Sequence, residues 1–155
     1  MGGASTASAS RTRGAYRLHR PATAAEWETY HRIRRDVLLE ARKYAIEVDA
    51  ESAPGHHPRL LWLGDQPIGS IRIDVVASGD AALRLVAIDP LRQRQGHGRA
   101  LLQLAEEFAR SLACGRAVVY STPDAAEFYS KAGYAEDDWD DVYVSGIVQM
   151  AKRLN

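Results

Sequence analysis

The sequence predicts a mixed α/β (α+β) domain in which helices flank one central, mostly antiparallel mixed sheet. Three observations support this fold class. Apolar residues recur at helical spacing in three segments, and short apolar runs bounded by turn residues lie between them. The two kinds of segment follow the order β-α-β-β-β-α-β-α-β, which suits layers around a single sheet. The length of 155 residues suits one domain, expected over residues 15–155 behind a flexible Gly-, Ser- and Ala-rich tail over 1–14.

One strand and one helix are predicted in the first third of the chain. AYRLHRPAT, residues 15–23, reads as a strand that Pro21 ends. A helix is expected over residues 26–46, because apolar side chains recur there three and four positions apart. Residues 47–58 are polar and interrupted by proline and glycine, which predicts a loop or a short irregular helix.

Three consecutive antiparallel strands are predicted over residues 59–90, with turns at residues 64–67 and 78–80. An amphipathic helix follows, and Gly115 suits the position just after its end. The apolar stripe expected for that helix consists of Ala100, Leu101, Leu104, Ala105, Phe108 and Leu112.

A strand, a short helix and a final strand complete the predicted fold. RAVVYS, residues 116–121, has the apolar character of a strand inside a sheet. The helix after it is expected to have Thr122 as N-cap, Pro123 in its first turn and Gly133 at its end. VYVSGIVQMAKRL, residues 142–154, supplies the last strand.

Composition excludes several classes of function. Lys and Arg together number 20 and Asp and Glu number 20, so no surplus of positive charge indicates a nucleic-acid binder. No apolar run approaches the length of about 20 residues that spans a bilayer, so no membrane partner is expected. Cys114 is the only cysteine, which excludes an intrachain disulfide and fits a reducing compartment. We therefore expect a cytoplasmic protein.

The most informative segment is VAIDPLRQRQGHGRALLQLA, residues 86–105, in which an apolar strand turns through a basic bend into a helix. No Ser, Thr, Asp or Asn stands at the start of that helix to bond its free backbone N–H groups. Gly96 and Gly98 lack a Cβ atom, so an anion can approach the backbone at the positive end of the helix dipole. The bend therefore predicts a phosphate-binding site.

Three phosphate-binding patterns compete for this bend. A P-loop needs Lys and then Ser or Thr after its last glycine, whereas Gly98 is followed by Arg99 and Ala100. A dinucleotide fingerprint needs a third small residue where Leu101 stands, and an acidic residue that RAVVYS lacks. The pattern Gln/Arg-x-x-Gly-x-Gly/Ala after a strand fits QRQGHG, residues 93–98.

With this pattern the chain resembles the GNAT superfamily of N-acetyltransferases. LRLVAIDPLRQRQGHGRALL resembles the acyl-CoA motif of that family, and AAEFYSKAGY resembles its second hallmark. The resemblance covers roughly residues 15–155, and the segment from residue 33 to 52 is similar to the ElaA-like branch. It implies N-acetylation with acetyl-CoA as co-substrate, a pantetheine arm bound by a strand end and a diphosphate bound at the bend. The coenzyme-binding residues it implies are Val86, Ala87, Ile88, Gln93, Arg94, Gln95, Gly96, His97, Gly98, Arg99 and Thr122.

Tyr129 matches the usual general acid of the family, and a phenol with a pKa of about 10 can protonate a leaving thiolate. A core role is the alternative, because Ala125, Phe128, Tyr129 and Ala132 share one helical face. Ala117 stands where some branches of the family carry a Glu that acts as the general base, so the motifs assign no general base in this chain. The open candidates are Glu47, Asp49, Glu51, His56 and His57.

Two further features bear on the mechanism. Cys114 falls at the far end of the coenzyme helix, so we expect direct attack in a ternary complex instead of an acyl-cysteine. The histidines show no metal-ligand spacing, so we expect no metal. EDDWDD, residues 136–141, is either a negative mouth that attracts a cationic amine or an ordinary solvated hairpin loop.

The sequence thus predicts an acetyl-CoA-dependent N-acetyltransferase that acts on a small-molecule or peptide amine, as a monomer or homodimer. A CoA-binding sensor without turnover is the alternative, since the Glu and Asn of the family motif are replaced by Ala117 and Thr122. A protein that binds nucleotides alone is a third possibility.

Overall fold

The computed structural model describes residues 15–37, 53–141 and 145–155. Seven strands form one sheet in the order β1-β2-β3-β4-β5-β7-β6. Only β4 and β5 pair in parallel; the other neighbouring strands are antiparallel. The predicted mixed fold is therefore confirmed. The strands are β1 (Tyr16–His19), β2 (His56–Leu63), β3 (Gln66–Val75), β4 (Ala81–Ile88), β5 (Arg116–Ser121), β6 (Ala135–Glu136) and β7 (Val148–Arg153).

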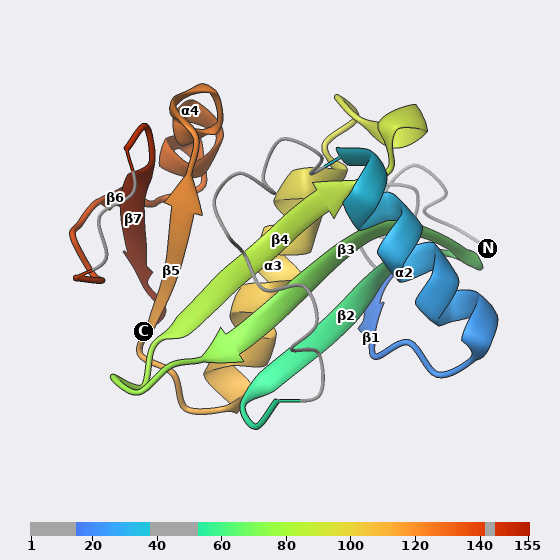
Figure 1. The fold of residues 1–155 in the computed structure, drawn as a ribbon, viewed down its shortest axis with the longest axis horizontal. Helices are drawn as coiled ribbons and strands as arrows, with labels where there is room; N and C mark the ends of the chain where they lie inside the picture. The colour runs from blue at the N-terminus through green and yellow to red at the C-terminus, as the bar shows by residue number, and fades with distance from the viewer. Residues whose placement is uncertain (1–14, 38–52, 142–144) are drawn as a thin grey trace, which may run out of the picture.

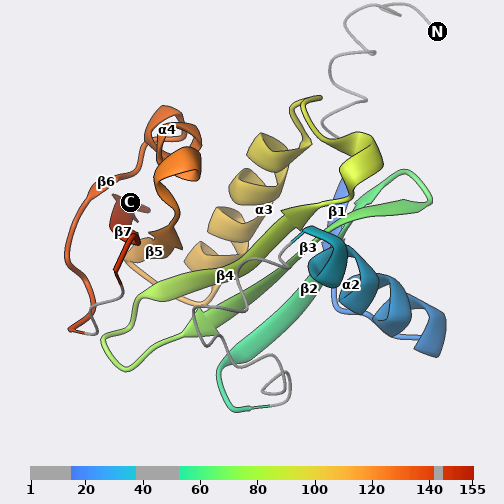
Figure 2. The ribbon, with the colours of Figure 1, turned by 45° about the horizontal axis from the view of Figure 1, so that its top comes forward.

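Helices cover both faces of the sheet (Figures 1 and 2). Helix α2 (Ala24–Val37) lies on one face, α3 (His97–Ser111) lies on the other, and α4 (Pro123–Lys131) packs against β5 and β7. A short 3-10 helix, η2 (Pro90–Arg92), follows β4. The sheet therefore has an apolar layer on each face.

The apolar core consists of a large cluster under α3 and a small cluster under α2. In the large cluster, Leu101 and Leu102 of α3 are fully buried against Ile71 and Ile73 of β3. In the small cluster, Tyr30 and Ile33 of α2 pack with Leu60 and Ala87. Burying one such side chain contributes about 1.5–3 kcal/mol. The predicted stripe of α3 was wrong at one end, because Leu112 is 38% exposed and Ala109 is buried instead.

The sheet opens between β4 and β5. These two strands pair only at Ala81 with Ala117 and at Ala82 with Val118, and beyond that point they diverge (Figure 1). A bulge lies in the diverging part of β4, where the register with β3 shifts and Leu85 has a φ of 59°. Such a φ is strained for a bulky residue. We call the opening between β4 and β5 the splay.

Two element boundaries differ from the sequence prediction. Strand β2 begins at His56 and includes Pro58, although residues 47–58 were predicted to be a loop. Strand β1 pairs only with Leu60 to Leu63, so Pro58 lies where β2 is an edge strand and its missing N–H costs no ladder bond. The predicted turn at 64–67 is shorter, because β3 begins at Gln66.

The end of α3 and the end of the chain hold two further differences. Ala113, with a φ of 64°, takes the left-handed position after α3 that was predicted for Gly115. The N–H of Cys114 donates to the carbonyl of Ala109 at 3.0 Å, which closes the helix end. Strand β6 was not predicted. The predicted tail over 1–14 and the predicted helix end over 38–46 lie outside the described residues.

Candidate active site

The bend after β4 is fixed by hydrogen bonds of its own residues. The side chain of Asp89 accepts from the N–H of Leu91 at 3.1 Å, and its carbonyl accepts from the N–H of Arg92 at 2.8 Å. The side-chain amide of Gln93 donates to the carbonyl of Ile88 at 3.0 Å. Arg32 of α2 lies 3.3 Å from the Asp89 carboxylate. Gln93 therefore braces the end of the strand.

The start of α3 has no side-chain cap. Gly96 occupies the N-cap position with a φ of 86°, and no side chain accepts a hydrogen bond from the first turn. Across the part of the chain that the structure describes, the N–H groups of His97, Gly98 and Arg99 have no hydrogen-bond acceptor. These groups lie at the positive end of the helix dipole. The arrangement can bind an anion such as a phosphate.

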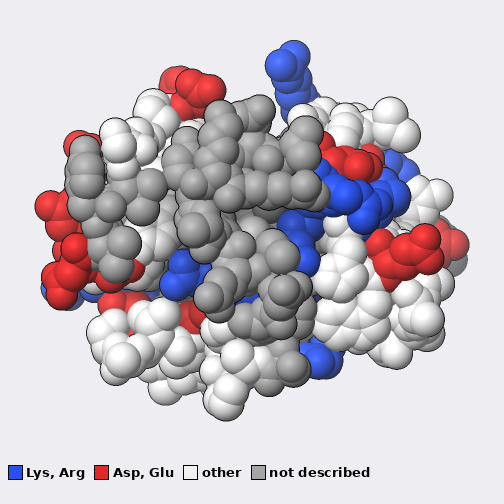
Figure 3. Space-filling model, viewed as in Figure 1, with Lys and Arg blue, Asp and Glu red and all other residues white. Residues whose placement is uncertain are grey.

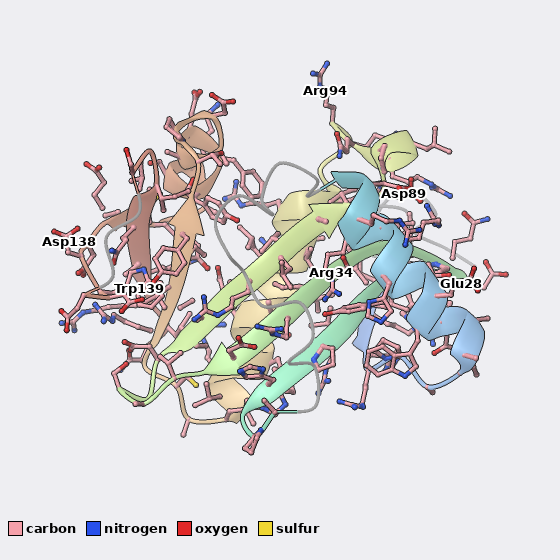
Figure 4. All side chains as sticks on the ribbon, in the orientation of Figure 1. Glu28, Arg34, Asp89, Arg94, Asp138 and Trp139 are labelled. Carbon is pink, nitrogen blue, oxygen red and sulfur yellow. The ribbon has the colours of Figure 1, made fainter. Side chains whose placement is uncertain are left out.

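Positive charge surrounds this helix start. Arg94 and Arg99 are exposed, and Arg94 extends from the bend away from the fold (Figure 4). Arg92 instead donates to the side chain of Gln66. The exposed arginines are therefore available to a diphosphate bound at the uncapped N–H groups.

His97 cannot add to this charge. Its Nδ1 lies 2.6 Å from the hydroxyl of Tyr16, and the imidazole is buried. Burial lowers the pKa of His97, and the positive charge of Arg92 lowers it further. The imidazole is therefore neutral near pH 7 and packs against Tyr16 of β1. His97 can thus bind an anion only through its backbone N–H.

Gly98 brings α3 and α4 together across the mouth of the splay. A Cβ atom on Gly98 would lie 3.2 Å from Cζ of Phe128 and 4.0 Å from the Ile88 side chain. The ring of Phe128 thus rests on the first turn of α3. Sequence reasoning assigned Gly98 to the diphosphate alone, and the structure gives this glycine a packing role as well.

The diverging part of β4 presents an open edge. Within the residues that the structure describes, β4 has no strand partner on its β5 side beyond Ala82, so backbone N–H and C=O groups of this edge can bind a ligand. The bulge changes the alternation of side chains: Leu83 and Val86 both pack on the α3 cluster, whereas Arg84 and Ala87 lie on the α2 face. Val86, Ala87 and Ile88 therefore line the edge that leads from the bend into the splay.

Tyr129 of α4 lies in the α3 cluster beside this edge. Its ring is in edge-to-face contact with Phe128 at 5.2 Å and with Tyr134 at 5.6 Å between centroids. The residue is 7% exposed, and burial raises its pKa to about 12. Within the described residues its hydroxyl has no hydrogen-bond partner. The side chain is both a core residue and a protonated donor without a partner.

The remaining residues of the two motifs have structural roles. Thr122 is the N-cap of α4, but its side chain makes no capping hydrogen bond. Ala117 is fully buried opposite Ala81, so the position offers no base. Cys114 is buried beyond the far end of α3, and burial raises the pKa of its thiol.

The two candidate bases that the structure describes, His56 and His57, both belong to β2. His57 faces the ring of Phe108 at 5.2 Å, and burial together with the charge of Arg59 lowers its pKa. His56 lies on the other face of β2, 3.5 Å from the carboxylate of Asp74. Glu47, Asp49 and Glu51 lie outside the described residues.

Sequence reasoning missed an ionic cluster on the α2 face of the sheet. The carboxylate of Asp74 accepts from Nε of Arg72 at 2.8 Å and forms an ion pair with Nε of Arg84 at 2.9 Å. Arg72 and Asp74 are buried, and the guanidinium carbon of Arg84 lies 5.7 Å from the ring centroid of Tyr120. The available signal was the pair of charges two residues apart in the apolar strand GSIRIDV, which places both on one face.

The acidic segment after β6 is partly fixed against β5 and β7. Nε1 of Trp139 donates to the carbonyl of Val119 at 3.0 Å, and the ring lies 4.8 Å from that of Tyr120. Gln149 bonds both the N–H and the carbonyl of Asp140, at 2.8 and 3.1 Å. The hydroxyl of Tyr120 donates to the carboxylate of Asp140.

The other acids of this segment face outward. Glu136, Asp138 and Asp141 are exposed, and Asp138 lies at the edge of the molecule (Figure 4). Figure 3 shows acidic residues gathered along that edge. Asp137 pairs with Arg116 at 3.0 Å. The segment EDDWDD therefore combines a solvated acidic rim with an inner pair, Trp139 and Asp140, held beside Tyr120.

The described residues offer neither a metal site nor a membrane-spanning helix. Residues 15–37, 53–141 and 145–155 contain no group of three or more His, Cys, Asp or Glu side chains that could hold a metal ion. None of the helices in those ranges has the length and apolar character needed to cross a bilayer.

Comparison with known proteins agrees with this geometry. The family model described as acetyltransferase (GNAT) family matches residues 13–134. A protein assigned as an N-acetyltransferase from Lactobacillus plantarum is 25% identical, with a TM-score of 0.70 over 91% of this chain and 99% of that chain. An acetyltransferase from Bacillus subtilis, solved with CoA, is 14% identical, with a TM-score of 0.66 over 89% and 97%. A Staphylococcus aureus acetyltransferase is 14% identical, with a TM-score of 0.65 over 91% and 100%.

Proposed function

Since the chain belongs to the GNAT family of acetyltransferases, we propose that it transfers an acetyl group from acetyl-CoA to an amine by direct attack in a ternary complex. One observation supports this above the others. The uncapped N–H groups at the start of α3 lie next to the open edge of β4, so a diphosphate and an amide-bearing arm can be bound side by side.

The residues present suit the coenzyme. A diphosphate would accept from the N–H groups of His97, Gly98 and Arg99, with Arg94 nearby. Hydrogen bonds to charged groups contribute about 1.5–3 kcal/mol each, and three of them supply much of the ~8 kcal/mol behind micromolar affinity. The pantetheine arm would bond the backbone of residues 86–88.

Acetyl-CoA supplies an activated thioester, and the chain supplies the polarising and protonating groups. A backbone N–H next to the bulge at Leu85 would point at the thioester carbonyl and stabilise its developing charge. The amine nitrogen forms a bond to the carbonyl carbon and loses a proton to solvent, and the carbon–sulfur bond breaks. The hydroxyl of Tyr129 then donates its proton to the leaving thiolate.

A CoA-binding module without turnover is the second candidate. Ala117 favours it, because this fully buried position carries no base. Both functions require uptake of the coenzyme, and only the enzyme releases CoA thiol when an amine is added.

The test is a CoA-release assay over polyamines, aminoglycosides, amino acids and peptides, run beside thermal unfolding with acetyl-CoA, ATP and NAD. An enzyme shows stabilisation by acetyl-CoA and thiol release with at least one amine. Stabilisation without release from any amine supports the sensor, and equal stabilisation by ATP supports a nucleotide binder. We further propose that the protein is cytoplasmic and is a monomer or a homodimer. Gel filtration of the purified chain tests the oligomeric state.

A further inference from the structure

We infer that the acceptor is an amine that also carries a carboxylate group, and that Arg84 binds this carboxylate. The inference rests on the proposed acetyltransferase function and names the acceptor of that same site. Its basis is the pair of opposite charges that the structure places on either side of Tyr120 in the splay.

Arg84 lies at the deep end of the splay. It is the last residue of β4 before the bulge, opposite Arg72 of β3, and it lies on the face of the sheet away from α3. The α3 face is filled by the large apolar cluster, which includes Tyr129. An acceptor must therefore reach the thioester from the face that carries Arg84.

The guanidinium of Arg84 is oriented but not saturated. Its Nε forms an ion pair with the Asp74 carboxylate at 2.9 Å, and that carboxylate also accepts two hydrogen bonds from Arg72, at 2.8 and 3.0 Å. Among the described residues the two terminal nitrogens of Arg84 have no hydrogen-bond partner, and the side chain is 24% exposed. A guanidinium fork with free terminal N–H groups matches the geometry of a carboxylate.

A negative charge lies at the hydroxyl end of the Tyr120 side chain. The guanidinium carbon of Arg84 is 5.7 Å from the ring centroid, and the phenol hydroxyl donates to Asp140. Asp140 is held in place by Gln149, and Trp139 packs on the same ring. An acceptor with an ammonium and a carboxylate would match this pair of charges.

A purely cationic acceptor fits this arrangement less well. The exposed acids of the rim would attract a polyamine, but its charge would be repelled by Arg84 at the reacting end. The same guanidinium also disfavours a charged amine beside it, so it favours the neutral, nucleophilic form.

The test compares matched pairs of amines with the full chain: free α-amino acids and short peptides against their C-terminal amides, with spermidine as a polyamine. We expect kcat/KM at least tenfold higher for the free carboxylate. Removing the carboxylate charge lowers the pKa of the neighbouring amine, so amine basicity alone would favour the amide instead.

Arg84→Gln should reduce kcat/KM for the free carboxylates about tenfold or more and by a larger factor than for the amides, and Arg84→Lys should recover part of the loss. Arg153→Gln, at an exposed position on β7 outside the site, is the matched control. If Arg84→Gln does not fold, the comparison of free carboxylates with their amides in the wild-type protein still tests the inference. Equal kcat/KM for the free carboxylates and their amides, or a preference for spermidine, would overturn the inference without affecting the proposed acetyltransferase function. The absence of CoA release with any amine would overturn the proposed function itself.

Discussion

At the scale of single residues, the site depends on side chains whose protonation states are set by burial. Burial raises the pKa of Tyr129 to about 12, which keeps its hydroxyl protonated at neutral pH. Burial lowers the pKa of His97, which keeps its imidazole neutral beside the start of α3. The chain thus combines a proton donor with an uncharged ring, and both states can be tested by substitution.

Replacing Tyr129 with Phe should lower kcat by about 10²–10⁴-fold, the usual contribution of a general acid. The ring remains to fill the core, so thermal stabilisation by acetyl-CoA should be unchanged. Ser130→Ala, at the exposed neighbouring position on α4, is the control for effects on the helix. Wild-type turnover in Tyr129→Phe would restrict Tyr129 to its packing role.

The buried histidines predict a dependence of stability on pH. The pKa values of His57 and His97 are both lowered, so the unfolded chain binds more protons than the folded chain once the pH falls below about 6.5. The free energy of unfolding should therefore decrease as the pH falls from 6.5, and it should be independent of these groups above that pH. Urea titrations at several pH values measure this. His97→Gln should show a shallower decrease, and an unchanged slope would show that His97 does not contribute.

At the scale of elements, local patterns predicted the strands and helices well, and the errors lie where tertiary contacts decide. Pro58 marked a loop in the sequence, but β1 is too short to pair there, so the strand continues along an edge. Ala113 takes a left-handed conformation although Gly115 is two residues away. The uncapped start of α3 was predicted correctly, because the absence of a capping side chain is visible in the sequence.

The contact between Gly98 and Phe128 predicts a coupled pair of substitutions. Alanine suits a helix better than glycine by about 0.5–1 kcal/mol, but its Cβ would lie 3.2 Å from the Phe128 ring. Gly98→Ala should therefore gain less stability in the wild type than in a Phe128→Ala background. Urea unfolding of the four variants in a double-mutant cycle measures the coupling. Additive effects would show that the ring moves aside freely.

At the scale of the whole molecule, the splay separates the strands into two parts, β1 to β4 and β5 to β7, which one apolar cluster on the α3 face joins. Strands β4 and β5 share only two aligned pairs, and Phe128 bridges α3 and α4 farther along. The sequence could not predict this opening, because the two strands are 27 residues or more apart in the chain and their apolar patterns suit full pairing equally well. It could not predict the Arg84–Tyr120 contact either, because that contact exists only where the two strands meet on the same face.

A ligand that fills the splay should stabilise the whole fold. A coenzyme at 100 times its Kd adds about 2.7 kcal/mol, which raises the Tm of a domain of this size by about 5–11 °C. Hydrogen exchange should slow along residues 86–88 and at the N–H groups of His97, Gly98 and Arg99, since these groups would gain partners. Gly96→Asp places a carboxylate at the uncapped helix start, where it repels a diphosphate. This variant should lose most of the rise in Tm, whereas Arg153→Gln should keep it. A rise of equal size in Gly96→Asp would place the diphosphate elsewhere, because two negative groups cannot share those donors.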